Sequence, residues 1–168
     1  MDHLNAEIAS GTLLTRQNCI DYLTWTYFFR RLTKNPAYYK LESVKADTLN
    51  QYMLALVNTS LAKLTRGGCV EYNSEEETVT STTLGRLASF YYLSYETISY
   101  LNGALGPNLE PSDLIKILAN AKEFFGLPVR HNEEVLNEAL THLVPNKVPK
   151  HDLENPHVKA NLLIQAHI

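Results

Sequence analysis

The sequence lacks the features that mark secreted, membrane-spanning or disulfide-rich proteins. Only two of its 168 residues are cysteines, Cys19 and Cys69, which is too few for a disulfide framework. Both lie in apolar surroundings and are predicted to be small buried hydrophobes. No stretch approaches the roughly 18 consecutive apolar residues of a membrane helix, and the opening MDHLNAEI is too polar for a signal peptide. These absences predict an intracellular protein without a membrane partner.

The sequence also lacks an excess of positive charge. It has 15 Lys and Arg residues against 18 Asp and Glu residues, which gives a formal net charge of −3. Strong phosphate binding depends on concentrated basic side chains. The composition therefore argues against a protein whose main task is to hold nucleic acid, and the acidic run at residues 75–77 strengthens this argument.

Recognisable catalytic motifs are missing too. The chain has neither the GxxxxGK[ST] loop that cradles phosphates nor the GxSxG turn of serine hydrolases. His131 and Glu134 are predicted to share a helix face, with Glu138 one turn later, but a zinc site needs three or four converging ligands. We therefore predict no catalytic, cofactor-binding or metal-binding residue. A hydrolase built on His131 and Glu134 is an alternative of another class.

The most informative stretch that is present is residues 15–32, TRQNCIDYLTWTYFFRRL. Thr15 is suited to cap a helix there, and at about 100° per residue this helix would be apolar on two sides. One side holds Ile20, Leu23, Tyr27 and Phe28, and the other holds Tyr22, Trp25, Phe29 and Leu32. An ordinary surface helix buries a single stripe. The stretch therefore predicts either the central helix of a larger all-α core or a helix that docks a second body.

The first half of the chain follows the order helix, helix, long helix, β-hairpin. Its predicted elements are helices at residues 4–9, 15–32 and 43–66 and strands at residues 69–72 and 78–81. Ser43 is predicted to cap the long helix, and Gly67-Gly68 is predicted to end it. This order is typical of a winged helix, here residues 1–82.

The second half changes to helices alone. They are predicted at residues 84–93 and 97–105, from residue 111, and at residues 131–143 and 155–168. In the helix from residue 111, Leu114, Ile115, Leu118 and Ala121 are expected to point inward. The predicted fold is therefore mainly α with one small β-hairpin: a winged helix followed by a partial all-α helical bundle at residues 83–168.

The last helix is expected to begin at Asn155, with Pro156 in its first turn. Its aliphatic residues Leu162 and Leu163 are expected to lack their natural partner. We expect this stripe to dock only partly: it folds back on Leu136, Leu140 and Leu143, stays frayed, or pairs with another copy of the chain.

The longest motifs resemble one protein family. The winged-helix region of Ski-two-like superfamily-two DExH-box helicases is similar to residues 4–8 (LNAEI), 21–32 (DYLTWTYFFRRL) and 35–39 (NPAYY). The start of the adjoining helical domain is similar to residues 84–92 (LGRLASFYY), 127–134 (LPVRHNEE) and 156–167 (PHVKANLLIQAH). The resemblance covers nearly the whole chain, and the type is that of the helicases of the spliceosome and of the activating signal cointegrator complex.

The resemblance implies a role without catalysis. In this family two RecA-like motor domains bind ATP and Mg²⁺, the winged helix packs against them, and the helical domain helps to close a ring around one nucleic-acid strand. This chain contains neither motor domain and is expected to stop before the ratchet helix of the family. The implied partners are the motor domains and the downstream helical domain of the same parent chain. Through the parent, the implied partner is nucleic acid, RNA or DNA, and the implied location is the nucleus.

Six side chains are candidates for contact with these partners. We expect Trp25, Phe29, Arg30 and Arg31 to dock against a motor domain. Lys63 and Arg66, in the helix that corresponds to a recognition helix, could make weak contact with nucleic acid. The alternative is a free-standing winged-helix protein with a nucleic-acid-binding or regulatory role, and the lack of a basic face argues against it.

Overall fold

The structure is a computed structural model that describes residues 1–149 and 151–168. This part of the chain forms two compact units, residues 1–98 (unit 1) and residues 99–168 (unit 2). Unit 1 combines helices with one β-hairpin, whereas the described residues of unit 2 form helices and loops. The predicted fold class, mainly α with one small β-hairpin, is confirmed. A domain boundary after residue 82 stays a prediction.

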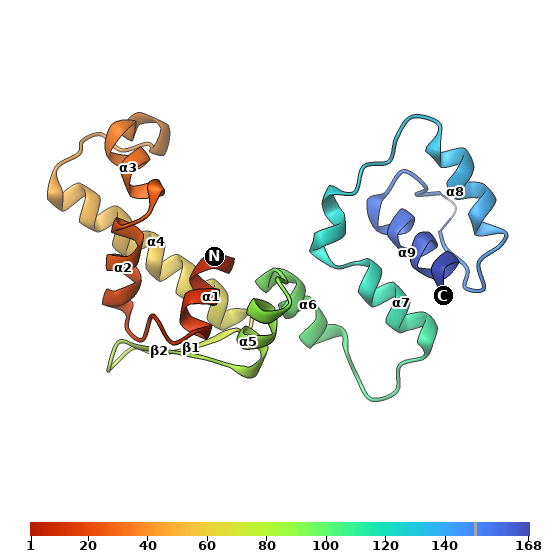
Figure 1. The fold of residues 1–168 in the computed structure, drawn as a ribbon, viewed down its shortest axis with the longest axis horizontal. Coiled ribbons are helices and arrows are strands. Elements are labelled where there is room, and N and C mark those ends of the chain that lie inside the picture. Colours follow the sequence, from red (N-terminus) through yellow and green to blue (C-terminus); the bar gives the residue numbers. More distant parts are fainter. Residues whose placement is uncertain (150) are drawn as a thin grey trace. The chain divides into compact units, whose positions relative to one another are not determined.

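Unit 1 follows the predicted order of elements (Figure 1). Its helical elements are α1 (Asp2–Ala9), α2 (Arg16–Thr24), α3 (Tyr27–Lys34), the 3-10 turn η1 (Pro36–Tyr39), α4 (Ala46–Arg66) and α5 (Thr83–Phe90). Its strands are β1 (Val70–Asn73) and β2 (Thr78–Ser81), which pair antiparallel with Val70 opposite Ser81. α4 is the longest helix of the unit, and both α2 and β1 pack against it.

The single helix predicted at residues 15–32 is wrong, because this stretch forms two helices, α2 and α3. The hydroxyls of Thr24 and Thr26 each donate a hydrogen bond of 2.6 Å to the backbone carbonyl three residues earlier. Thr26 then adopts an extended conformation with φ −88° and ψ 158°. Threonine hydroxyls compete in this way with the helical hydrogen-bond ladder. A single helical wheel across the stretch therefore misplaces the side chains that follow Trp25.

The helix ends lie mostly where the sequence predicts them. The Thr15 side-chain oxygen accepts a hydrogen bond of 3.1 Å from a backbone N–H in the first turn of α2. Gly68, just beyond the end of α4, has a φ of 74°, a conformation that glycine adopts without steric cost. The predicted cap at Ser43 is wrong. α4 begins only at Ala46, and the Ser43 hydroxyl instead contacts the hydroxyl of Thr48 at 3.0 Å.

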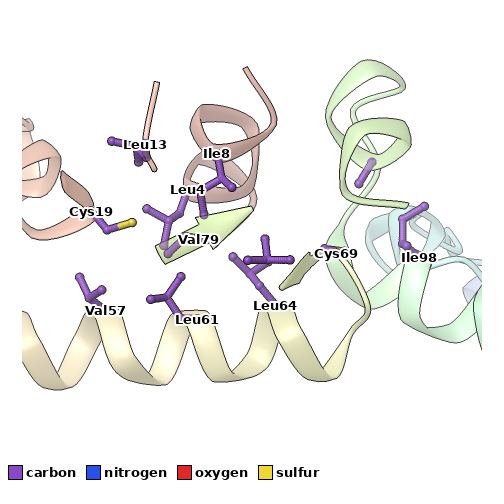
Figure 2. Close-up of a cluster of buried hydrophobic side chains, with 12 residues drawn as sticks. Leu4, Ile8, Leu13, Cys19, Val57, Leu61, Leu64, Cys69, Val79 and Ile98 are labelled. Carbon is purple, nitrogen blue, oxygen red and sulfur yellow. The ribbon is translucent and has the colours of Figure 1, made fainter. Parts of the chain in front are cut away.

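The hydrophobic core of unit 1 lies along one side of α4 (Figure 2). Val57, Leu61 and Leu64 project from α4 at helical spacing toward side chains of α1, α2 and β2. The whole cluster comprises Leu4, Ile8, Leu13, Cys19, Val57, Leu61, Leu64, Cys69, Val70, Val79, Ala88 and Ile98. Burial raises the pKa of the Cys19 thiol to about 11 and also raises the pKa of Cys69. Both cysteines are buried hydrophobes, as predicted.

The tip of the β-hairpin is fixed beside the start of α2. The backbone N–H of Arg16 donates to the backbone carbonyl of Glu77 at 2.9 Å, and the side chains of these two residues form an ion pair. Glu75 and Glu76, next in the tip, are exposed. The hairpin therefore presents an acidic end at this side of unit 1.

In unit 2 the last helix is surrounded by the other elements (Figure 1). The elements are α6 (Tyr95–Ala104), which crosses the boundary between the units, α7 (Pro111–Ala119), the 3-10 turn η2 (Lys122–Gly126), α8 (Glu133–Thr141) and α9 (Pro156–His167). α9 contacts α7, η2 and α8. Its buried residues are Val158, Lys159, Ala160, Asn161, Leu162 and Gln165. Half of them are polar.

The start of α9 is confirmed, but α9 does not fold back on Leu136 and Leu143, which are exposed. The side-chain oxygen of Asn155 accepts a hydrogen bond of 2.9 Å from the N–H of His157, which caps the helix. Leu162 is fully buried, whereas Leu163 and Leu136 are exposed. α9 therefore does not fold back through an aliphatic stripe on the preceding helix. It forms the centre of unit 2 and buries several polar side chains instead.

The inward face predicted for α7 is also partly wrong. Leu114 and Leu118 are about half exposed, and Ala119 is fully buried in their place. The small side chain of Ala119 lets α9 approach closely, and its backbone carbonyl lies 3.0 Å from the Nδ1 atom of His157. α7 therefore packs on α9 through its small residue rather than through its leucines.

Candidate docking surfaces

Exposed aromatic and basic side chains surround the junction of α2 and α3. Trp25, at the end of α2, has 90% of its surface exposed. Tyr27, Arg30 and Arg31 are also exposed and, at i, i+3 and i+4, share one side of α3. Tyr38 is exposed in η1, which packs on α3. We call these five residues the α3 surface.

Aromatic packing holds the α3 surface in place from behind. The ring of Phe28 meets the ring of Tyr39 edge to face, with centroids 5.5 Å apart, and Leu32 is fully buried. In front, the guanidinium carbon of Arg31 lies 5.6 Å from the ring centre of Tyr38, which is a cation–π geometry. The buried side chains attach α3 to unit 1 and leave its other side free for contact.

The four side chains predicted to dock a motor domain fall into two groups. Trp25, Arg30 and Arg31 are exposed, whereas Phe29 is half buried. Three of the four predicted residues are therefore accessible, one at the end of α2 and two on α3. Their docking role stays a prediction.

Charge is unevenly distributed over unit 1. Residues 25–45, around the α3 surface, contain a single acidic residue, Glu42, against five basic residues, Arg30, Arg31, Lys34, Lys40 and Lys45. The acidic hairpin tip lies beside the start of α2, whereas the basic segment, residues 25–45, begins at the end of α2. The nine residues of α2 span about 13 Å. The α3 surface is therefore the basic end of the unit and fits a partner of opposite charge.

Lys63 and Arg66 are placed apart from the α3 surface. Both are exposed in the last turn of α4, where positive charge is favoured by the helix dipole. α3 lies toward the other end of α4 (Figure 1). Two basic residues alone give few contacts for a polyanion such as nucleic acid. Their contact with nucleic acid stays a prediction.

Sequence reasoning missed an aromatic edge at the end of α5. Phe90, Tyr91 and Tyr92 are all exposed, and the rings of Phe90 and Tyr91 stack edge to face with centroids 4.9 Å apart. The sequence signal was the run of three aromatic residues at 90–92, and the structure exposes it because α5 buries only small residues, Gly85 and Ala88. A helix that packs through small residues leaves its large ones outside.

Sequence reasoning also missed a buried lysine in unit 2. Lys159 is only 8% exposed, and its Nζ donates to the carbonyl of Pro128 at 2.7 Å and lies 2.7 Å from Oε1 of Glu133. The other carboxylate oxygen of Glu133 accepts a 2.7 Å hydrogen bond from the N–H of Arg130. That hydrogen bond and Lys159 together lower the pKa of Glu133. These bonds tie the loop before α8 to α9.

Because the folded state lowers the pKa of Glu133, its contribution to stability should depend on pH. The contribution is complete above the ordinary carboxyl pKa of about 4.3 and is lost as the pH falls through the lower folded value. We expect the free energy of unfolding of unit 2 to fall less at acid pH in Glu133→Gln than in the wild type. Urea unfolding across the acid range measures this free energy. Glu138→Gln, in the same helix but exposed, is the control. Parallel pH profiles for Glu133→Gln and the wild type would contradict the assignment.

The alternative built on His131 and Glu134 loses its geometric basis. α8 begins at Glu133, after Asn132 with a φ of 65°, so His131 lies outside the helix and does not share its face. Among residues 1–149 and 151–168, no cluster of three or more His, Cys, Asp or Glu side chains could hold a metal ion. In that same part of the chain, every helix is too short or too polar to cross a bilayer.

Comparison with known domain families identifies the family of the chain. Residues 81–168, more than half of the chain, match the Sec63 Brl domain. The chain belongs to this family. Residues 1–74 match a Winged Helix-turn-helix domain, which confirms the predicted winged helix ahead of the Sec63 Brl helices.

Three relatives show where such Sec63 Brl chains occur. Activating signal cointegrator 1 complex subunit 3 of Mus musculus is 44% identical over 167 residues. DExH-box ATP-dependent RNA helicase DExH14 of Arabidopsis thaliana is 48% identical over 166 residues. The human U5 small nuclear ribonucleoprotein 200 kDa helicase is 38% identical over 167 residues. Each match covers 99% of this chain and 8% of the relative. The resemblance to Ski-two-like DExH-box helicases is confirmed, and the chain is a helicase-associated region.

Proposed function

We propose that this chain is a non-catalytic connector of an ATP-dependent DExH-box helicase and that its α3 surface packs against a RecA-like motor domain of the same parent chain. The observation that carries the proposal is Trp25, which is 90% exposed at the end of α2, together with the exposed residues Arg30 and Arg31 of the helix that follows, α3. Tryptophan and arginine are the side chains that most often dominate binding energy at interfaces.

The fixed geometry of the α3 surface supports this role. Leu32 and the ring contact between Phe28 and Tyr39 hold α3 from its buried side. A surface that is ordered before contact loses little conformational entropy on docking. The basic charge of residues 25–45 favours a motor-domain face that carries carboxylates.

The parent supplies the chemistry in this proposal. ATP and Mg²⁺ bind in its motor domains, and its nucleic acid, RNA as in the name of the Arabidopsis relative, passes through a ring that this chain helps to close. The human relative is named for a small nuclear ribonucleoprotein, which supports a nuclear location for the parent. No residue of this chain has a catalytic role in the scheme.

The alternative is a free-standing winged-helix protein that binds nucleic acid or regulates a partner. Nucleic-acid binding by the isolated chain separates the two functions. With a net charge of −3 and an acidic hairpin tip, the chain is expected to bind RNA and DNA, single-stranded or duplex, only weakly at physiological salt. Fluorescence anisotropy with labelled oligonucleotides measures this affinity. Submicromolar binding would favour the free-standing protein, and loss of that binding in Lys63→Ala with Arg66→Ala would place it on α4.

A further inference from the structure

α8 presents an apolar face to solvent. Val135, Leu136 and Leu143 are 62%, 65% and 79% exposed, and Ala139 is exposed as well. Leu143 belongs to the turn that closes the helix, because its N–H donates to the carbonyl of Leu140. At 100° per residue the four exposed side chains fall within about 100° of arc. We call them the α8 stripe.

Polar contacts hold the opposite side of α8 inside unit 2. Asn137 is only 2% exposed, and its side-chain amide donates to the carbonyl of Leu153 at 3.0 Å. Glu133 forms the ion pair with the buried Lys159. These contacts fix the rotation of the helix about its axis. Turning the α8 stripe inward would leave a buried amide and a buried ammonium group without partners.

α8 is therefore the reverse of an ordinary surface helix, which buries its apolar stripe and exposes its polar residues. Isolated exposed leucines are common, but four apolar residues that form one stripe mark a contact site. The remaining question is what kind of surface covers the α8 stripe.

The charge of α8 selects the kind of partner. The helix carries Glu133, Glu134 and Glu138 and no lysine or arginine. Glu134 and Glu138 lie one turn apart on the flank of the α8 stripe. Two copies packed stripe to stripe with their helices antiparallel would bring these carboxylates together, which opposes that form of self-association. An apolar helix flanked by basic residues would complement them instead.

We propose that the α8 stripe binds an amphipathic helix whose apolar face is flanked by Lys and Arg, and that the parent chain supplies this helix from outside the 168 residues. The chain spans about 8% of the length of the relatives it matches, so a same-chain helix has ample sequence to come from. This inference rests on the proposed function, because it treats the chain as part of a longer helicase.

Two synthetic peptides test the chemistry of the partner. Both have leucines at i, i+3, i+4 and i+7; one has lysine and the other glutamate at the flanking positions. The lysine peptide is expected to bind the chain at least about tenfold more tightly at physiological salt and to shift the NMR signals of the α8 stripe. Leu136→Gln should abolish the difference, and Leu163→Gln, at an exposed leucine of α9, should not. Equal binding of the two peptides, or shifts elsewhere, would overturn the proposal.

Hydrogen exchange of the full-length parent tests the source of the helix. Amides from residue 133 to residue 143 should exchange at least about tenfold more slowly in the parent than in the 168-residue chain, and Leu136→Gln in the parent should restore fast exchange. Exchange as fast in the parent as in the chain would overturn the same-chain source, and a concentration-dependent dimer that protects α8 would assign the stripe to a second copy.

The same exchange data separate this inference from the proposed function. Amides of α3 report on motor-domain docking, whereas amides of α8 report on the basic helix. Protection of α3 without α8 would leave the connector role standing and overturn the α8 proposal. Protection of α8 without α3 would support the basic helix and contradict the docking of the α3 surface.

Discussion

Replacing Gly85 by alanine is expected to reduce the free energy of unfolding of unit 1 by about 3 kcal/mol, the upper end of the usual cost of overpacking. A Cβ at this position would lie 2.0 Å from the carbonyl oxygen of Cys69 and 2.9 Å from its carbonyl carbon. Backbone atoms cannot rotate away as a side chain can. α5 is also held by hydrogen bonds from Asn5 to the Gly85 carbonyl at 2.9 Å and from the Gly85 N–H to Thr82 at 3.0 Å. It cannot move aside without losing them.

A second glycine in a helix provides the matched control. Gly103 lies in α6, and a Cβ built there meets no atom within 4 Å. Gly103→Ala should raise stability by about 0.5 to 1 kcal/mol, because alanine restricts the unfolded chain. Urea unfolding followed by circular dichroism measures both variants. Equal and small effects at the two positions would show that α5 does not pack as closely on Cys69 as the structure has it.

Arg30→Glu is expected to lower nucleic-acid unwinding by the proposed full-length helicase at least about tenfold, a loss of about 1.4 kcal/mol or more in docking. The reversed charge would face the carboxylates that the basic α3 surface is proposed to meet, and a like-charge contact in an interface costs several kcal/mol. The melting temperature of the 168-residue chain should stay unchanged, because the Arg30 side chain is exposed. Trp25→Ala should have the same pair of effects.

Lys147→Glu is the control for this experiment. Lys147 is exposed in unit 2, so the variant makes the same change of net charge away from the α3 surface. It should leave unwinding close to that of the wild type. If Arg30→Glu instead destabilises the chain itself as much as it impairs the parent, Arg30 is a structural residue of unit 1 rather than a docking residue.

Local signals were enough to predict most element boundaries. The Thr15 cap, the Gly68 turn and the Asn155 cap each depend on one residue and its nearest backbone groups. The two strands were found for the same reason, since a polar turn separates two short β-rich runs. Such features need no knowledge of the tertiary packing.

The break between α2 and α3 shows where local reasoning failed. Thr24 and Thr26 are tolerated inside helices, and the break becomes visible only in the extended backbone of Thr26. The exposure of Trp25 and Arg30 was nevertheless anticipated. A segment that is apolar on two sides has more apolar surface than one small unit can bury. Phe29 was placed less well, because its position depends on the rotation that the break introduces.

Unit 2 was harder to predict because polar residues fill its interior. Hydrophobic periodicity assigns Leu114 and Leu118 to the core, yet both are exposed. The buried positions include Asn137 and Lys159, whose burial depends on partners distant in sequence. A lone lysine or asparagine in a helical pattern gives no sign that such a partner exists.

Oxidative labelling of Trp25 is the most direct test of the central claim that the α3 surface is covered by a motor domain in the parent. Trp25 is the only tryptophan of the chain and 90% of its surface is exposed, so hydroxyl-radical modification of this residue can be read from a single peptide by mass spectrometry. We expect Trp25 to be labelled several times more slowly in the full-length parent than in the 168-residue chain. Labelling at the same rate in both would contradict the account.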